Sequence, residues 1–181
     1  WITSKITDYP LTPNQISIAV FFISVFSGLI ISIEGYFFLL LGALLAQLSS
    51  ILDGCDGEIA RLKLLESKFG GWFDRVLDRY SDLFILMGLT FHTYFIHKTL
   101  TVFFIGFIVV GGKIISSYTA FVYDTVVSAH SNFRIGRDLI IFIILIGALL
   151  NIPYITLVVL AFIMNAEVCK RLWILKDKLD Y

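Results

Sequence analysis

Apolar residues run through this chain in long segments that short polar turns interrupt. The turn signals include Glu34-Gly35, Gly70-Gly71 and Asn151-Ile152-Pro153, and most segments between them are near the roughly 20 residues that a helix needs to cross a bilayer. The pattern predicts six transmembrane helices, at residues 13–33, 37–62, 70–95, 99–127, 136–150 and 153–174. Because lipid offers no hydrogen bonds, backbone groups must pair within each segment, so we expect an all-α integral membrane protein.

The segment before the first span has a different pattern. Residues 1–9, WITSKITDY, mix apolar and polar positions in a way that suits a short amphipathic helix on the membrane surface. Pro10 and Pro13 separate it from the six-helix bundle at 13–174. The chain starts at Trp1 without signal-peptide features, so we expect residues 1–181 to be the membrane domain of a longer chain with an upstream cytoplasmic domain.

Composition supports the membrane assignment and suggests an orientation. Hydrophobic residues make up 58% of the chain and charged residues 15%, whereas a soluble domain carries about a quarter charged residues. With an even number of spans, all Lys and Arg residues except Lys98 and Lys113 fall on one side, which we expect to be cytoplasmic together with both termini. No basic, aromatic-interleaved run indicates nucleic-acid binding.

Four aspartates stand at the adjoining ends of the second and third spans. Asp53 and Asp56 are three apart and Asp74 and Asp78 are four apart, so each pair shares one face of its helix. We expect the turn at 68–71 to make the two helices antiparallel neighbours, so that the four carboxylates converge at the cytoplasmic end. Four bare carboxylates would repel each other and would be costly to desolvate, which predicts cations among them.

Carboxylate ligands alone favour two hard divalent cations, Mg²⁺ or Mn²⁺, over zinc, which prefers His or Cys. Paired ions of this kind are common in phosphoryl chemistry. Room for a ligand comes from small residues beside the acids: Gly57, Ala60, Gly70 and Gly71. Arg61 can then meet the phosphates of that ligand. The alternative is a set of solvated helix ends whose acids pair with Arg61, Arg75 and Arg79.

The motif resembles the complete signature of the CDP-alcohol phosphotransferase family: Asp53-x2-Asp56-Gly57-x2-Ala60-Arg61-x8-Gly70-x3-Asp74-x3-Asp78. The resemblance implies that an alcohol displaces CMP from a CDP-linked donor and forms a phosphodiester. It also implies that Asp53, Asp56, Asp74 and Asp78 bind the metals, and that Asp78 is the general base for the acceptor hydroxyl.

The resemblance further implies a set of CDP-binding residues: Asn14, Asp56, Gly57, Ala60, Arg61 and Gly70. Small side chains let the cytidine lie against the helix backbone. Thr12-Pro13-Asn14 resembles a family element whose Asn reaches the diphosphate. Its alternative role is a helix start, with Thr12 as N-cap and Pro13 at the first helical position.

Three basic residues outside the motif predict a pocket for a phosphorylated acceptor. Lys113 lies within an apolar span, where an unpaired ammonium is expensive, so it either binds the acceptor phosphate or pairs with Asp124 or Glu167. Arg134 and Arg137 are three apart on one helix face and can complete the pocket. Positive-inside topology is the alternative explanation for these two arginines.

The sequence around the motif resembles the membrane half of archaeal or thermophile enzymes in which a soluble cytidylyltransferase precedes the transferase. Some of these make inositol phosphodiesters such as di-myo-inositol phosphate phosphate, so our leading prediction is CDP-inositol with inositol phosphate. A phospholipid synthase fits the same motif, with CDP-diacylglycerol or CDP-archaeol as donor and inositol phosphate, glycerol phosphate or serine as acceptor. The resemblance also suggests a homodimer. A divalent-cation transporter is a distant alternative, because the acids lie at one end of the bundle.

Overall fold

The computed structural model describes residues 12–62, 67–126 and 136–179, with side chains except at 13, 55–61, 124–126 and 177–179. These residues form helices and no strand: α2 (Pro13–Ser32), α3 (Tyr36–Leu62), α4 (Lys68–His97), α5 (Leu100–Val126), α6 (Arg137–Leu149) and α7 (Pro153–Leu179). The six predicted helices are thus confirmed, and the largest difference is that α7 continues beyond the predicted end at 174. The amphipathic helix predicted at 1–9 lies outside the described residues.

The helix ends follow local sequence signals. Thr12 caps α2, and its backbone N–H donates to Oε1 of Gln15 at 3.0 Å, as in a capping box. Gly35, between α2 and α3, has a φ of +120°, a conformation that L side chains rarely adopt. At the start of α4, Ser67 Oγ accepts a hydrogen bond from the Gly70 N–H at 2.9 Å. Residue types of this kind are typical of helix ends, so the helix limits could be predicted from the sequence.

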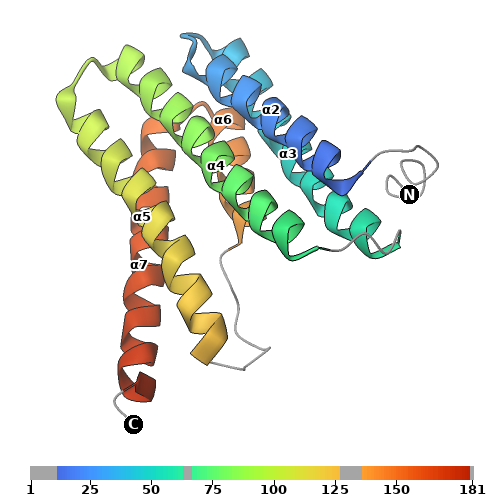
Figure 1. Ribbon diagram of the computed structural model, residues 1–181. Helices are drawn as coiled ribbons and strands as arrows, with labels where there is room; N and C mark the ends of the chain where they lie inside the picture. Colours follow the sequence, from blue (N-terminus) through green and yellow to red (C-terminus); the bar gives the residue numbers. More distant parts are fainter. Residues whose placement is uncertain (1–11, 63–66, 127–135, 180–181) are drawn as a thin grey trace.

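The central helix of the bundle is α4, flanked by α2 and α3 on one side and by α5 and α7 on the other (Figure 1). Helix α2 packs along both α3 and α4, α5 packs along α7, and the short α6 contacts α3 and α7. Helices α3 and α4 touch each other only over a short stretch. The expectation that α3 and α4 are close neighbours is therefore corrected. Each of them packs mainly against α2 and not against the other.

A glycine crossing sets the distance between α2 and α4. A Cβ at Gly88 would stand 2.2 Å from the carbonyl oxygen of Gly28, and a Cβ at Gly28 would stand 2.4 Å from that of Phe84. The two backbones are in direct contact, as small residues allow at helix interfaces in membranes. This contact fixes α4 against α2 and therefore helps to place the acidic residues of α4.

The outer surface of the bundle is strongly apolar. Phe104, Phe107 and Phe162 are 69%, 79% and 75% exposed. Among the described residues, three segments are long and apolar enough to cross a membrane: Asn14–Ser32, Tyr36–Gly54 and Leu100–Tyr123. These features indicate a membrane protein. That α4, α6 and α7 also cross the membrane stays a prediction, and α6 has only 13 residues.

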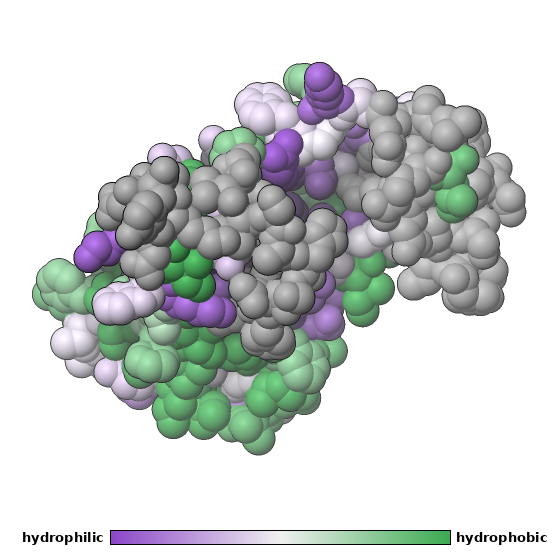
Figure 2. All heavy atoms as spheres, turned by 90° about the horizontal axis from the view of Figure 1, so that it is seen from below, coloured by the Kyte–Doolittle hydropathy of each residue, from purple (hydrophilic) through white to green (hydrophobic). Residues whose placement is uncertain are grey.

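One end of the molecule gathers the polar residues. The starts of α2, α4 and α6 and the ends of α3, α5 and α7 all point toward the lower end in Figure 1. Figure 2 looks onto this end and shows hydrophilic residues in purple at several places beside the grey atoms, with a large hydrophobic area in green along one flank. The candidate site lies toward this end.

Candidate active site

The guanidinium of Arg137, at the start of α6, joins acids from two other helices. Its Nη1 lies 3.0 Å from Asp53 Oδ1 of α3 and also contacts Asp78 Oδ1 of α4. Its Nη2 donates to Ser24 Oγ of α2 at 3.3 Å. Because Asp53 and Asp78 share one nitrogen, their oxygens lie within two hydrogen-bond lengths of each other. The structure thus brings two of the four motif aspartates together around a cation.

The other two motif aspartates are less fully described. Asp74 lies one turn before Asp78 on α4 and interacts with it electrostatically. Asp56 belongs to α3, but its side chain lies outside the described part of the chain. Within that described part, no group of three His, Cys, Asp or Glu side chains is arranged to hold a metal ion. The donor chemistry still fits a hard cation, since Asp53 and Asp78 supply carboxylate oxygens that already enclose a positive charge.

Asp82 is a buried acid that the sequence analysis missed. It is 5% exposed and lies one turn beyond Asp78 on α4. Its Oδ2 is 3.2 Å from Lys113 Nζ of α5 and 3.5 Å from Arg79 Nη1, while its Oδ1 is 3.4 Å from Arg137 Nε. A signal was present, because the four-residue spacing of Asp74 and Asp78 continues to Asp82 on the same helix face.

Lys113 has a different partner from those predicted. It pairs with Asp82 of α4, whereas Glu167 pairs with Arg171 at 3.2 Å on its own helix. The reason is that this face of α5 turns toward α4, and that Arg171 already neutralises Glu167. The side chain of Asp124 lies outside the described residues.

The structure also brings together two of the predicted acceptor-binding residues. Lys113 and Arg137 come from different helices and meet at Asp82, and the side chains of both are 10% exposed. The third, Arg134, lies outside the described residues. The site therefore contains two largely buried cations beside the motif aspartates.

Two predicted CDP-binding residues lie next to each other. A Cβ built on Gly70 would stand 3.1 Å from Asn14 Oδ1 and 3.0 Å from Ser67 Oγ. The absence of a side chain at Gly70 therefore leaves room for Asn14 where α2 and α4 begin. Thr12 is the N-cap of α2, which confirms that the segment starts a helix. Gly57, Ala60 and Arg61 form part of α3, and their side chains lie outside the described ones.

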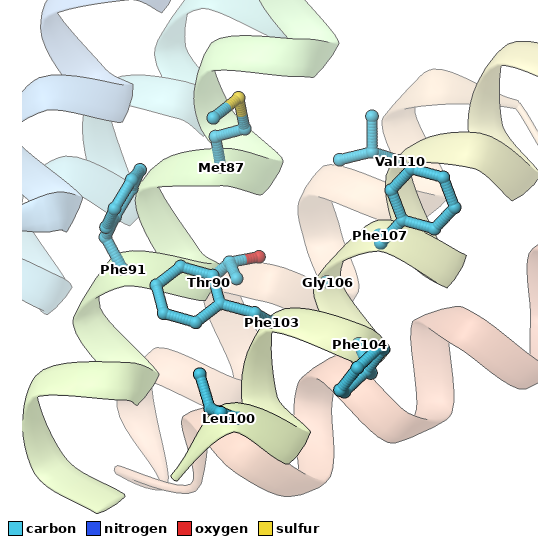
Figure 3. A pocket seen from close by; sticks show the side chains of 9 residues that line it. All are labelled: Met87, Thr90, Phe91, Leu100, Phe103, Phe104, Gly106, Phe107 and Val110. Carbon is cyan, nitrogen blue, oxygen red and sulfur yellow. The ribbon is translucent and has the colours of Figure 1, made fainter. Parts of the chain in front are cut away.

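An apolar groove of about 650 Å³ opens between α4 and α5 (Figure 3). Its lining is almost entirely hydrophobic: Met87, Thr90, Phe91, Leu100, Phe103, Phe104, Gly106, Phe107 and Val110. These residues lie beyond Asp82 on α4 and before Lys113 on α5, toward the opposite end of the molecule from the aspartates. The groove is therefore separate from the charged site.

The chain matches a known family over most of its length. The family model described as CDP-alcohol phosphatidyltransferase matches residues 10–170. Curated relatives described as bifunctional IPC transferase and DIPP synthase include proteins from Rubrobacter xylanophilus, 32% identical over 93% of this chain and 38% of theirs, and Archaeoglobus fulgidus, 38% identical over 78% and 28%. The chain thus spans well under half of these relatives.

A shorter relative and a solved structure give further comparisons. The archaetidylinositol phosphate synthase of Pyrococcus horikoshii is 32% identical over 49% of this chain and 45% of its own. The crystal structure of phosphatidylinositol phosphate synthase from Mycobacterium tuberculosis, with CDP-DAG bound, aligns with a TM-score of 0.78 over 94% of this chain and 89% of that one. The sequence identity is 21%, so this likeness supports the fold.

Proposed function

The chain belongs to the CDP-alcohol phosphatidyltransferase family, and from this premise we propose that it transfers a substituted phosphate group from a CDP-linked donor to an alcohol. The observation that carries the proposal is the convergence of Asp53 and Asp78, two signature aspartates on different helices, on one cationic nitrogen. A site of this kind is suited to binding positive charge next to a diphosphate.

The metal-binding residues in this proposal are Asp53, Asp56, Asp74 and Asp78. Two Mg²⁺ or Mn²⁺ ions bound there would neutralise the diphosphate of the donor and the charge that develops on it. Arg137 also supplies positive charge between Asp53 and Asp78. Carboxylate oxygens are suitable ligands for either ion.

Asp78 is the proposed general base. The acceptor hydroxyl attacks the phosphorus that carries the donor alcohol, its proton passes to Asp78, and a new P–O bond forms. The bridging P–O bond breaks and CMP leaves with the electron pair, so no covalent intermediate on the protein is needed. A positioned base of this type typically contributes about 10²–10⁴ in rate.

The proposed donor site lies where α2 and α4 begin. Asn14 and Gly70 are adjacent there, and Gly70 leaves the space that a side chain would fill. Asp56, Gly57, Ala60 and Arg61 on α3 complete the site in this proposal. A small-residue surface lets a nucleotide approach the helix backbone, and Arg61 supplies charge for the diphosphate.

The proposed acceptor is inositol phosphate, and the preferred donor is CDP-inositol. Lys113 and Arg137 support a phosphorylated acceptor, because they form a largely buried cationic pair beside Asp78. Arg134 is a further candidate. The names of the curated relatives support an inositol compound, while CDP-DAG in the Mycobacterium tuberculosis structure keeps a lipid donor as the second candidate.

We also propose the wider setting of the domain. The relatives are described as bifunctional and are much longer, which supports a cytidylyltransferase domain on the same polypeptide. The distribution of Lys and Arg supports a multi-pass protein with both termini and the active site on the cytoplasmic side. The family resemblance suggests a homodimer.

Release of CMP tests the proposal. The protein in detergent with Mg²⁺ receives CDP-inositol or CDP-diacylglycerol together with a panel of alcohols and phosphorylated alcohols. We expect CMP with one donor and acceptor pair, and loss by about 10²-fold or more in Asp78→Asn. The matched control is Asp138→Asn, an exposed carboxylate on α6 that accepts a hydrogen bond from Ser50 and should retain activity.

If no donor releases CMP although the protein binds Mn²⁺, the transferase proposal is wrong. Ion flux in liposomes would then test the transporter alternative.

A further inference from the structure

We propose that Asp82 is a positioning residue that holds Lys113 and Arg137 as one phosphate-binding pair beside Asp78. The inference rests on the proposed function for the identity of the acceptor, but the arrangement of charges stands on its own. Asp82 lies outside the eight-residue signature and is not one of the proposed metal ligands. Asp82 affects phosphate binding by positioning Lys113 and Arg137, not by touching the phosphate itself.

The two oxygens of Asp82 contact different helices. Oδ2 lies 3.2 Å from Lys113 Nζ on α5, and Oδ1 lies 3.4 Å from Arg137 Nε on α6. Since one small, rigid carboxylate contacts both groups, it sets the distance between them. Without its negative charge, the two cations would repel each other across a poorly solvated space.

Burial makes this bridge more important than a surface ion pair. Asp82 is 5% exposed, and the side chains of Lys113 and Arg137 are each 10% exposed. Cations this far from water depend on nearby anions to remain in place. Arg79 also contacts Asp82 at 3.5 Å, but its side chain is 41% exposed, so water screens much of that interaction.

The contacts of Arg137 show why Asp82 differs from the other acids. Nη1 faces Asp53 and Asp78, which are proposed metal ligands, and Nη2 faces Ser24. Asp82 is the acid on the Nε side, and it is not a member of the proposed metal set. If Asp53 and Asp78 bound metal ions, Asp82 would still hold Arg137 at the site.

The Nε atom of Arg137 also has unused hydrogen-bonding capacity. It is buried and, among the described residues, has no hydrogen-bond partner, because the geometry toward Asp82 gives an ion pair only. Buried donors normally find an acceptor. A phosphate oxygen is the kind of acceptor that could use this donor together with the Lys113 ammonium.

The test compares Asp82→Asn with wild type and with the control Asp138→Asn. Asparagine keeps the size of aspartate and removes the charge. We expect the KM for a phosphorylated acceptor and the apparent Kd for inorganic phosphate, read from thermal shifts in detergent, to rise by about tenfold or more. The KM for the CDP donor and the affinity for Mn²⁺ should stay within about twofold. A merely structural role would lower the melting temperature without this selective change.

A double-mutant cycle keeps the proposal testable if Asp82→Asn folds poorly. Asp82→Asn/Lys113→Met removes both charges of the Asp82–Lys113 ion pair and avoids an unpaired ammonium. If Asp82 acts by holding Lys113, the double variant should bind phosphate nearly as well as Lys113→Met alone, so the two effects are not additive. A clearly weaker phosphate affinity in the double variant than in Lys113→Met would show that Asp82 does not act through Lys113 and would overturn the proposal.

The outcomes separate this inference from the proposed function. If the wild-type protein releases no CMP from any donor, the transferase proposal fails. The apparent Kd values for inorganic phosphate still decide the role of Asp82. If Asp82→Asn retains wild-type phosphate affinity and acceptor KM, the positioning role is wrong whatever the reaction.

Discussion

The buried charges of Glu167 and Arg171 balance each other on one helix, whereas the charges around Arg137 come from four helices and form a network. Glu167 Oε1 and Arg171 Nη2 lie 3.2 Å apart on α7, and Arg171 also donates to the carbonyl oxygen of Ser116 on α5. We call this the balanced pair. The acidic cluster consists of Asp53, Asp78 and Asp82 with Lys113 and Arg137.

The difference indicates what each group of charges does. The balanced pair joins α7 to α5 and leaves no charge for a ligand to complete, so we interpret it as structural. In the acidic cluster, carboxylates from two helices gather around cations from two others, and Asp74 adds further negative charge nearby. Carboxylates brought together from two helices are costly to desolvate without nearby positive charge. The acidic cluster is therefore the region suited to binding a cation or a charged substrate.

The largest expected effect comes from removing divalent cations. EDTA should abolish CMP release, and Mn²⁺ should restore it. Mn²⁺ should also stabilise the folded protein, by about 2.7 kcal/mol at a hundred times its Kd, because it binds the folded state. Thermal unfolding in detergent measures this, with Asp53→Asn/Asp78→Asn expected to lose the stabilisation and Glu167→Gln expected to keep it. Equal stabilisation of all three proteins would place the cation elsewhere.

Substitutions in the balanced pair should lower the stability of the protein and leave its activity largely unchanged. Glu167→Gln leaves Arg171 buried without its counter-charge, at 5% exposure, and should lower the free energy of unfolding by about 3–5 kcal/mol. CMP release per folded molecule should change little. The variant Glu167→Gln/Arg171→Met should recover much of the stability, as measured by thermal unfolding. If the double variant is as unstable as the single one, the loss does not come from an unpaired charge.

The smallest effect is expected at the rim of the balanced pair. Lys170 Nζ lies 3.8 Å from Glu167 Oε2, and the Lys170 side chain is 49% exposed. Water and salt screen such a contact, so Lys170→Met should change stability by less than about 0.5 kcal/mol. A loss approaching that of Glu167→Gln would mean that Lys170, rather than Arg171, is the main partner of Glu167.

The positions of the helices could be predicted from the sequence because the signals are local. Long apolar runs mark the helices, and residues such as Thr12, Gly35 and Ser67 stand at their ends for reasons of backbone geometry and hydrogen bonding. The order of the helices in space was less accessible. The prediction placed α3 and α4 side by side, but backbone contact at Gly28 and Gly88 brings α2 against α4 instead.

For the candidate site, the sequence by itself determined which acids share a helix face, since the three- and four-residue spacings of Asp53, Asp56, Asp74 and Asp78 fix this within each helix. Only the tertiary structure decided which charges meet. Arg137 reaches Asp53 and Asp78, and Lys113 pairs with Asp82 rather than Glu167. Helical periodicity states which residues lie together on one helix, but the packing of whole helices decides which faces oppose each other.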